Sequence, residues 1–378
     1  MAASAKSPPV ALLVCSSGGH LTQLLALRPW WDTRPRTWVT QDTPQSRSAL
    51  AGENIVWGHF PTTRHAGNLL RNALLAIRML LPRPARPELI ISTGAGLAVP
   101  FFILGRLLRI RTVYIEVFDR VDSRTLTGRL CQPFSSLFLV QHPQQQALYS
   151  DSLVVGSLLG ARPAAPAPDG AQPGGAPGGL PALLVTLGTN KHPFSRAVDW
   201  TGRWLADGGD QQVRLILQHG ATPVPPGPDR FPELGYDELQ GALARAAIVV
   251  THGGPATIME ARAAGHVPIT LPRRPDLGEQ VDGHQLRFAR MLRAEGLAVV
   301  CDTELEFRAA LDRAAAALAA GTGQAGVMEA LGAGLAAGPQ SGGPGTERWP
   351  DGTARTAELI DALLVRGATP AAAAKGRR

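Results

Sequence analysis

Thr251-His-Gly-Gly-Pro-Ala-Thr-Ile-Met-Glu260 is the stretch of sequence that decides the fold. The apolar run 248–251 predicts a strand that stops at His252, and Pro255 is a typical first residue of a helix. A strand, two glycines and a helix form the βα unit of a doubly wound α/β domain. Backbone N–H groups at the start of such a helix can bind phosphate oxygens. The stretch therefore predicts an α/β domain with a turn that binds a diphosphate.

The residues that follow extend this candidate site. Glu260 lies one turn farther along the expected helix, where its carboxylate can accept hydrogen bonds from both hydroxyls of a ribose. The alternative is that Glu260 is an ordinary charged residue on the surface of the helix, which the combined spacing of the segment disfavours. Gln285 is expected to reach a sugar. The donor-binding candidates in this half are His252, Gly253, Gly254, Thr257, Glu260, Gln280, His284 and Gln285.

Two further loops join an expected strand to an expected helix through glycine. In Cys15-Ser-Ser-Gly-Gly-His20, Gly18 and Gly19 offer backbone donors, and His20 can accept a proton from a hydroxyl group. A structural histidine is the alternative. Leu187-Gly188-Thr189-Asn190-Lys191 again offers backbone donors and a hydroxyl. Neither loop has the GxxxxGK[ST] or GxGxxG spacing, which disfavours a Walker-type nucleotidase and a dinucleotide-dependent dehydrogenase.

The length and composition predict two α/β domains. A chain of 378 residues with 44% hydrophobic and 18% charged residues is long enough for two cores. Strand and helix patterns alternate in both halves, which indicates two Rossmann-like doubly wound sheets. The expected parts are an N-terminal domain 1–160, a Pro/Gly-rich linker 161–180, a C-terminal domain 181–334, and a Gly-rich segment 335–378 with one last helix, 353–365, and a loose tail.

Cysteine spacing and apolar runs exclude several classes of protein. Cys15, Cys131 and Cys301 are widely separated, so neither a disulfide framework nor a zinc site is expected. No apolar run reaches about 18 residues, and we therefore expect no membrane-spanning helix.

The positive charge is concentrated in the first half, which indicates an anionic partner. Residues 1–160 contain 16 Lys/Arg and 8 Asp/Glu, a net charge of +8, whereas the whole chain has +7. A basic amphipathic helix expected at 68–81 can lie on an anionic membrane, and the alternative is a core-facing helix with a solvated basic face. Nucleic acid is disfavoured because aromatic residues are only 5% and no nucleic-acid-binding motif is present.

At this point the sequence resembles a known family of transferases. The motifs Ser16-Ser-Gly-Gly-His-Leu21, Ser92-Thr-Gly-Ala-Gly96, Tyr114–Val121 and Leu126-Thr-Gly128 resemble the acceptor subunit of the bipartite N-acetylglucosaminyltransferase that adds the second sugar to dolichol diphosphate. Val185–Asn190, His252-Gly-Gly254 and His284-Gln285 resemble its donor subunit. The chain looks like both subunits fused, and is similar to bacterial two-subunit exopolysaccharide transferases. More distantly, it resembles the lipid II transferase of glycosyltransferase family 28.

This resemblance implies a GT-B fold, in which two Rossmann-like domains face each other across a cleft. It implies a UDP-sugar in the C-terminal domain and a polyprenyl-diphosphate-linked saccharide at the N-terminal domain. Gly18, Gly19 and His20 would face the donor, with His20 as the first candidate for the general base and Glu116 as the second. No metal or other cofactor is expected, since no DxD-like pair lies at a predicted loop, and helix N-termini would stabilise the leaving group instead. Pro255 departs from the family pattern but fits a first helical turn.

The expected function is inverting transfer of a sugar in cell-surface polysaccharide synthesis, by a cytoplasmic protein peripherally attached to the inner face of the cell membrane. Two alternatives are a UDP-sugar 2-epimerase of the same architecture and a non-catalytic nucleotide-sugar-binding membrane adaptor. The sequence leaves open whether the sugar is glucuronic acid, glucose or N-acetylglucosamine.

Overall fold

The computed structural model describes residues 11–62, 65–82, 86–120, 122–159, 179–333, 335 and 352–365. They divide into two units, the first containing the described residues up to 159 together with 352–365, and the second containing 179–335. Most of the predicted linker, 161–178, lies outside the described residues, as do the Gly-rich stretch 336–351 and the tail after 365.

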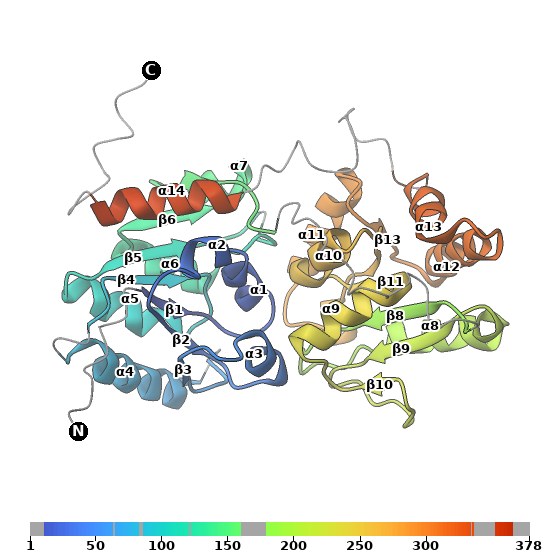
Figure 1. Cartoon of the computed structure of the whole chain (residues 1–378), viewed down its shortest axis with the longest axis horizontal. Helices are drawn as coiled ribbons and strands as arrows, with labels where there is room; N and C mark the ends of the chain where they lie inside the picture. Colours follow the sequence, from blue (N-terminus) through green and yellow to red (C-terminus); the bar gives the residue numbers. More distant parts are fainter. Residues whose placement is uncertain are drawn as a thin grey trace, which may run out of the picture. The chain divides into compact units, whose positions relative to one another are not determined.

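The first unit is built on a parallel sheet with the strand order β3-β2-β1-β4-β5-β6-β7 (Figure 1). In its centre lies β1 (Ala11–Val14), whose residue Leu12 pairs with Thr37 on one side and Ile90 on the other. All four β1 residues are buried, as expected for a strand covered on both faces. The remaining strands are β2 (Arg36–Thr40), β3 (Ile55–Trp57), β4 (Leu89–Ser92), β5 (Arg111–Ile115), β6 (Leu137–Val140) and β7 (Leu153–Val154).

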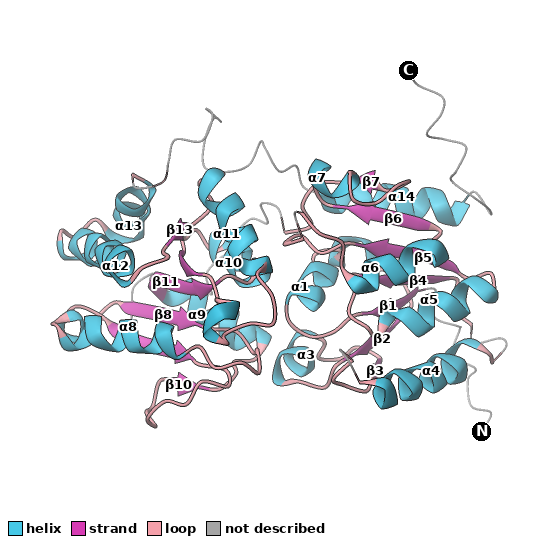
Figure 2. Cartoon of the chain, turned by 180° about the vertical axis from the view of Figure 1, so that it is seen from behind, coloured by secondary structure: helices cyan, strands magenta, loops and turns pink. Residues whose placement is uncertain are grey.

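Helices cover both faces of this sheet. Alternate strand residues such as Leu12, Val14 and Ile90 pack with Phe101 and Phe102 of α5, and α4, α5 and α6 lie in front of the sheet in Figure 2. The helices are α1 (Gly19–Leu25), α2 (Arg28–Trp31), α3 (Pro44–Ala49), α4 (Ala66–Leu80), α5 (Ala98–Leu107), α6 (Leu126–Cys131), the 3₁₀ turn η1 (Gln132–Phe134) and α7 (Pro143–Gln146).

The last helix, α14 (Gly352–Val365), belongs to the first unit although it follows the second unit in the sequence. Asp361 accepts hydrogen bonds from Trp30 Nε1 at 2.8 Å and from Arg34 Nη2 at 3.0 Å. The Gly352 N–H donates to the carbonyl of Ser157 at 2.8 Å. These contacts join the end of the described chain to elements from its beginning.

The second unit repeats the architecture with a parallel sheet ordered β10-β9-β8-β11-β12-β13. Its strands are β8 (Ala182–Thr186), β9 (Arg214–Gln218), β10 (Arg230–Phe231), β11 (Ala246–His252), β12 (Ile269–Leu271) and β13 (Val299–Val300). Its helices are α8 (Ser195–Ala206), α9 (Tyr236–Arg245), α10 (Pro255–Ala263), α11 (His284–Ala294), α12 (Glu304–Ala319) and α13 (Gly323–Gly332), with 3₁₀ turns η2 (Gly209–Gln211) and η3 (Pro275–Leu277).

The prediction of two doubly wound α/β sheets is confirmed. In the first unit the strand order reverses between β1 and β4, and in the second between β8 and β11. Ligands of open α/β sheets bind beyond the carboxyl ends of the strands at such a reversal. The loops after β1, β4, β8 and β11 therefore mark the places in each unit where a site is expected.

The strands β3, β7 and β10 have no counterpart among the predicted strands. They contain only two or three residues, lie at or next to a sheet edge, and are only partly buried, so their sequences lack a long apolar run. Among the described residues, no helix is both long and apolar enough to cross a membrane.

Candidate active site

His20 lies where β1 gives way to α1, beside the loop that follows β4. Its Nδ1 donates a hydrogen bond of 2.7 Å to the carbonyl of Thr93, and Thr93 Oγ1 donates one of 2.7 Å to the His20 carbonyl. Because a carbonyl only accepts, the hydrogen of the neutral ring resides on Nδ1, and Nε2 is the basic nitrogen. Burial lowers the pKa of His20, so the ring is neutral near pH 7. This is the protonation state that a general base requires.

The loop after β4 leaves room for the His20 ring through Gly94. A Cβ atom on Gly94 would lie 2.9 Å from His20 Cε1 and 3.0 Å from the Tyr114 hydroxyl oxygen. Gly94 has φ +116°, and Ala95 follows with φ +70°, an unusual value for a residue with a side chain. Backbone strain of this kind is concentrated at functional sites.

The segment 116–120, which follows β5, is held by buried glutamines that sequence reasoning missed. Gln145 Nε2 donates to the Val117 carbonyl at 2.6 Å, and Gln141 Nε2 donates to the Glu116 carbonyl at 2.8 Å. Gln23 Oε1 accepts from the Phe118 N–H at 3.2 Å. The segment carries Asp119 and Arg120, whose charges act in opposite directions on the pKa of His20. Isolated glutamines in the sequence give no signal of this network.

Glu116 occupies a closed environment. Its side chain is 0% exposed, and its carboxylate accepts hydrogen bonds from Thr125 Oγ1 at 2.8 Å, from the Val117 N–H at 2.9 Å and from the Tyr149 hydroxyl. A Cβ atom on Gly128 would lie 2.4 Å from Glu116 Oε2. Burial raises the pKa of Glu116. This environment favours a structural role that joins β5 to α6 over proton exchange with a substrate.

In the second unit, the loops after β8 and β11 pack closely on each other. A Cβ atom on Gly188, which has φ +70°, would lie 2.6 Å from His252 Cε1. Gly254 approaches the same ring, because its Cβ would lie 2.4 Å from His252 Nε2. Burial and the charge of Arg273 lower the pKa of His252 to about 3, so it is neutral at pH 7. Thr189, next to Gly188, is exposed.

The remaining donor-binding candidates lie on α10, in the segment after η3 and at the start of α11. Thr257 is 9% exposed and Glu260 is partly buried, both on α10. Gln285 is 4% exposed, and its Oε1 accepts from the Arg273 N–H at 3.1 Å. Asp282 Oδ1 contacts His284 Nδ1 and accepts from the His284 N–H at 3.0 Å. Gln280 Oε1 accepts from Asn190 Nδ2 at 3.1 Å, which links it to the loop after β8.

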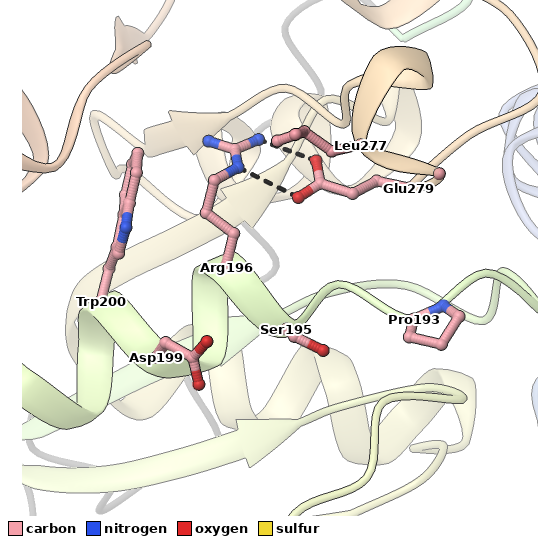
Figure 3. Close-up of a pocket in the computed structure, with 8 residues that line it drawn as sticks. Pro193, Ser195, Arg196, Asp199, Trp200, Leu277 and Glu279 are labelled. Carbon is pink, nitrogen blue, oxygen red and sulfur yellow. Dashed lines mark hydrogen bonds and ion pairs between the residues drawn. The ribbon is translucent and has the colours of Figure 1, made fainter.

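Arg196 and Glu279, which sequence reasoning did not select, line a pocket of about 410 Å³ beside these loops (Figure 3). Arg196 donates to Glu279 through Nε at 3.0 Å and Nη2 at 2.9 Å. The other lining residues are Pro193, Ser195, Asp199, Trp200, Leu277 and Gly278, none of them a predicted donor contact. Within the described residues, no group of three or more His, Cys, Asp or Glu side chains could hold a metal ion.

Both units match known protein families. Residues 63–158 match the family described as oligosaccharide biosynthesis protein Alg14 like, and residues 182–319 match the glycosyltransferase family 28 C-terminal domain. The chain is a glycosyltransferase of the GT-B fold. Its Alg14-like and family 28 domains are the two components that the sequence motifs predicted.

Curated relatives of this glycosyltransferase align with less than half of its length. The UDP-N-acetylglucosamine transferase subunit ALG14 of Cryptococcus neoformans is 28% identical over 178 residues, covering 38% of the chain and 77% of the relative. The human subunit of the same name is 24% identical over 177 residues, covering 39% of the chain and 82% of the relative.

Solved structures resemble the glycosyltransferase over nearly its whole length. MurG of Acinetobacter baumannii has a TM-score of 0.51 at 13% identity, covering 94% of this chain and all of that one. SnogD of Streptomyces nogalater has 0.54 at 17%, covering 94% and 99%. A UDP-N-acetylglucosamine 2-epimerase has 0.59 at 12%, covering 96% and 98%. At these identities the likeness establishes the fold alone.

Proposed function

We propose that this glycosyltransferase moves a sugar from a UDP-sugar to a polyprenyl-diphosphate-linked saccharide, with inversion, in the synthesis of a cell-surface polysaccharide. The observation that carries the proposal is the presence of an Alg14-like domain and a family 28 C-terminal domain in one chain. The Alg14 relatives are UDP-N-acetylglucosamine transferase subunits, which makes UDP-N-acetylglucosamine the first donor to test.

In the proposed reaction, an acceptor oxygen forms a bond to the anomeric carbon of the sugar. The bond from that carbon to the diphosphate oxygen breaks, UDP leaves, and His20 Nε2 takes the proton of the acceptor hydroxyl. The hydrogen bond from His20 Nδ1 to Thr93 supports this role because it leaves Nε2 as the basic nitrogen. Glu116 is a poorer candidate for the base because its carboxylate is fully buried and hydrogen-bonded within the protein.

For the donor, we propose that the diphosphate binds at the N-terminus of α10, close to Gly253, Gly254 and Thr257. The first N–H groups of a helix have no partners within the helix and stabilise negative charge. Glu260, one turn along, would accept hydrogen bonds from the ribose hydroxyls. The loop of Gly188 and Thr189, with Gln280, His284 and Gln285, would complete the sugar end of the site.

We further propose that the first unit attaches to the anionic inner face of the cell membrane through α4. Leu70, Leu74, Ile77 and Leu81 are 41% to 63% exposed, and their spacing places them on one side of the helix, away from the buried Asn72 and Ala76. Arg71 and Arg78 come from the same helix. An exposed apolar stripe with arginines is typical of a helix that lies on a lipid surface.

The experiment that tests the function combines the purified chain, a panel of UDP-sugars and membrane lipid extracts, with mass spectrometry of the lipid fraction. We expect one sugar to be added to a polyprenyl-diphosphate saccharide. The 2-epimerase has a specific observation in its favour, the fold likeness, and predicts epimer formation from the nucleotide sugar without lipid. UDP-sugar binding without transfer or epimerisation would instead identify an adaptor.

A further inference from the structure

Arg273 is a buried cation, and among the described residues no carboxylate is hydrogen-bonded to its guanidinium. Arg273 is 0% exposed and lies two residues after the end of β12. The guanidinium donates to the carbonyls of His192 at 2.7 Å, Leu187 at 2.8 Å and Glu279 at 3.0 Å. Its Nε is buried and has no hydrogen-bond partner among the described residues. A buried charge is costly unless an opposite charge lies near it.

Glu279, the carboxylate whose charge raises the pKa of Arg273, is already ion-paired with a second arginine. Both oxygens of Glu279 accept from Arg196 (Figure 3). Its Oε2 also accepts from the backbone N–H of Arg274 at 2.9 Å. The guanidinium carbons of Arg273 and Arg196 lie 4.7 Å and 5.2 Å from the centre of the Phe194 ring. Glu279 is therefore ion-paired with Arg196, and the buried Arg273 guanidinium has no ion-pair partner of its own among the described residues.

The Arg273 guanidinium lies behind the glycine loops of the second unit. Arg273 Nη2 holds the carbonyl of Leu187, which precedes Gly188. The backbone N–H of Arg273 donates to Gln285 Oε1 at 3.1 Å, and a Cβ atom on Gly253 would lie 3.0 Å from that same oxygen. After burial, the charge of Arg273 is the largest influence that lowers the pKa of His252, so its field reaches the turn after β11.

We propose that Arg273 is a built-in counter-charge for the diphosphate of a nucleotide donor. Its guanidinium acts through the Leu187 carbonyl that it holds and through its field, without touching the ligand, and Arg273 is therefore a positioning residue. The proposal rests on the proposed function and deepens it, since it assigns the charge complement of the donor site to a side chain behind the loops. Even at an effective dielectric constant near 20, the attraction between one such charge and a diphosphate is strong enough to change the diphosphate affinity by about tenfold.

The test compares the binding of UDP and of uridine to the purified full chain by calorimetry. Both ligands share the nucleoside, and only UDP has the diphosphate charge. We expect Arg273→Gln to weaken UDP binding about tenfold more than uridine binding, and Arg273→Lys to preserve the ratio of the two affinities. Glu279→Gln, which removes a negative charge near Arg273, should shift the ratio in favour of UDP.

A merely structural role for Arg273 predicts equal losses for both ligands in every variant, and that result overturns the inference. If Arg273→Gln fails to fold, judged by circular dichroism, Glu279→Gln decides, because an unchanged or lower preference for UDP contradicts the counter-charge. A wild-type chain that binds neither ligand overturns the proposed function, and this inference with it. A wild-type chain that binds UDP, with ratios unchanged in the variants, overturns this inference alone.

Discussion

His20 and Thr93 are joined by two hydrogen bonds of 2.7 Å, one from the imidazole Nδ1 to the Thr93 carbonyl and one from Thr93 Oγ1 to the His20 carbonyl. The pair links the loop after β1 to the loop after β4, on the two sides of the reversal in strand order. It fixes both the position of the ring and the location of its hydrogen. Our expectations for catalysis start from this pair.

Replacing His20 by Gln is expected to lower kcat by about 10² to 10⁴, because general-base assistance contributes on that order. UDP affinity, measured by calorimetry, should stay unchanged, since the proposed contacts to the diphosphate and the ribose lie in the second unit. Steady-state transfer assays check the rate. Near-wild-type turnover would remove His20 from the role of base, and Glu116→Gln, assayed in parallel with its thermal unfolding, would show whether the second candidate contributes.

The rate should depend on pH through a His20 pKa that burial holds below the usual value of 6.5. A general base acts when neutral, so kcat/KM should be constant above this depressed pKa and fall as the pH drops through it. Asp119→Asn removes a charge that raises the pKa of His20 and should move the acidic limb to still lower pH. An acidic limb that lies above pH 6.5, or that moves upward in the variant, contradicts the assignment.

Gly94→Ala is expected to lower both activity and stability. Its Cβ would lie 2.9 Å from His20 Cε1, and φ +116° is strained for any other residue, with a cost of about 1–3 kcal/mol. Thermal unfolding and transfer assays measure the two effects. Gly202→Ala in α8 is the matched control, because a Cβ there meets no atom within 4 Å and alanine favours a helix. Equal behaviour of the two variants would disprove the steric argument.

Transfer should continue in excess chelator, since we propose that helix N–H groups and Arg273 stabilise the departing diphosphate. The measurement is the initial rate with EDTA present, followed by addition of Mg²⁺ or Mn²⁺. Loss of activity on chelation and its return with either ion would replace this account with metal-assisted departure of UDP.

Membrane attachment should depend on the exposed stripe of α4. Replacing Leu70, Leu74 and Ile77 by Ser is expected to abolish co-flotation with vesicles that contain anionic phosphatidylglycerol. Because these side chains are 41% to 63% exposed, the melting temperature should change little. Equal flotation of the wild-type chain and the triple variant would contradict the proposed surface. So would wild-type binding to purely zwitterionic vesicles that equals its binding to the anionic ones.

The strand-glycine-helix units could be predicted from the sequence because their signals are local. The run ending at Val14 is followed by Gly18, Gly19 and a helix, and the run ending at His252 is followed by Gly253, Gly254 and Pro255. Apolar periodicity and turn residues determine such elements over a few positions. The same patterns also predicted the two sheets and the family resemblance.

The environments of single polar side chains could not be predicted in this way. The sequence predicts Glu116 as a possible base, yet in the structure its carboxylate is buried and hydrogen-bonded to Thr125, Tyr149 and Val117. Gln23, Gln141 and Gln145 were not selected, yet they hold the segment that carries Asp119. Whether a carboxylate meets solvent or a tyrosine hydroxyl depends on residues that are distant in the chain.

The sequence by itself determined the class of fold, the glycine loops and the position of His20 between a strand and a helix. Only the tertiary structure decided that Thr93 holds the His20 ring, that α14 packs on the first unit, and that Arg273 lies behind two glycine turns. The physical reason is the distance along the chain over which each effect acts. Propensity and periodicity act between neighbours in the chain, whereas burial, charge balance and hydrogen-bond partners arise only when separate segments meet.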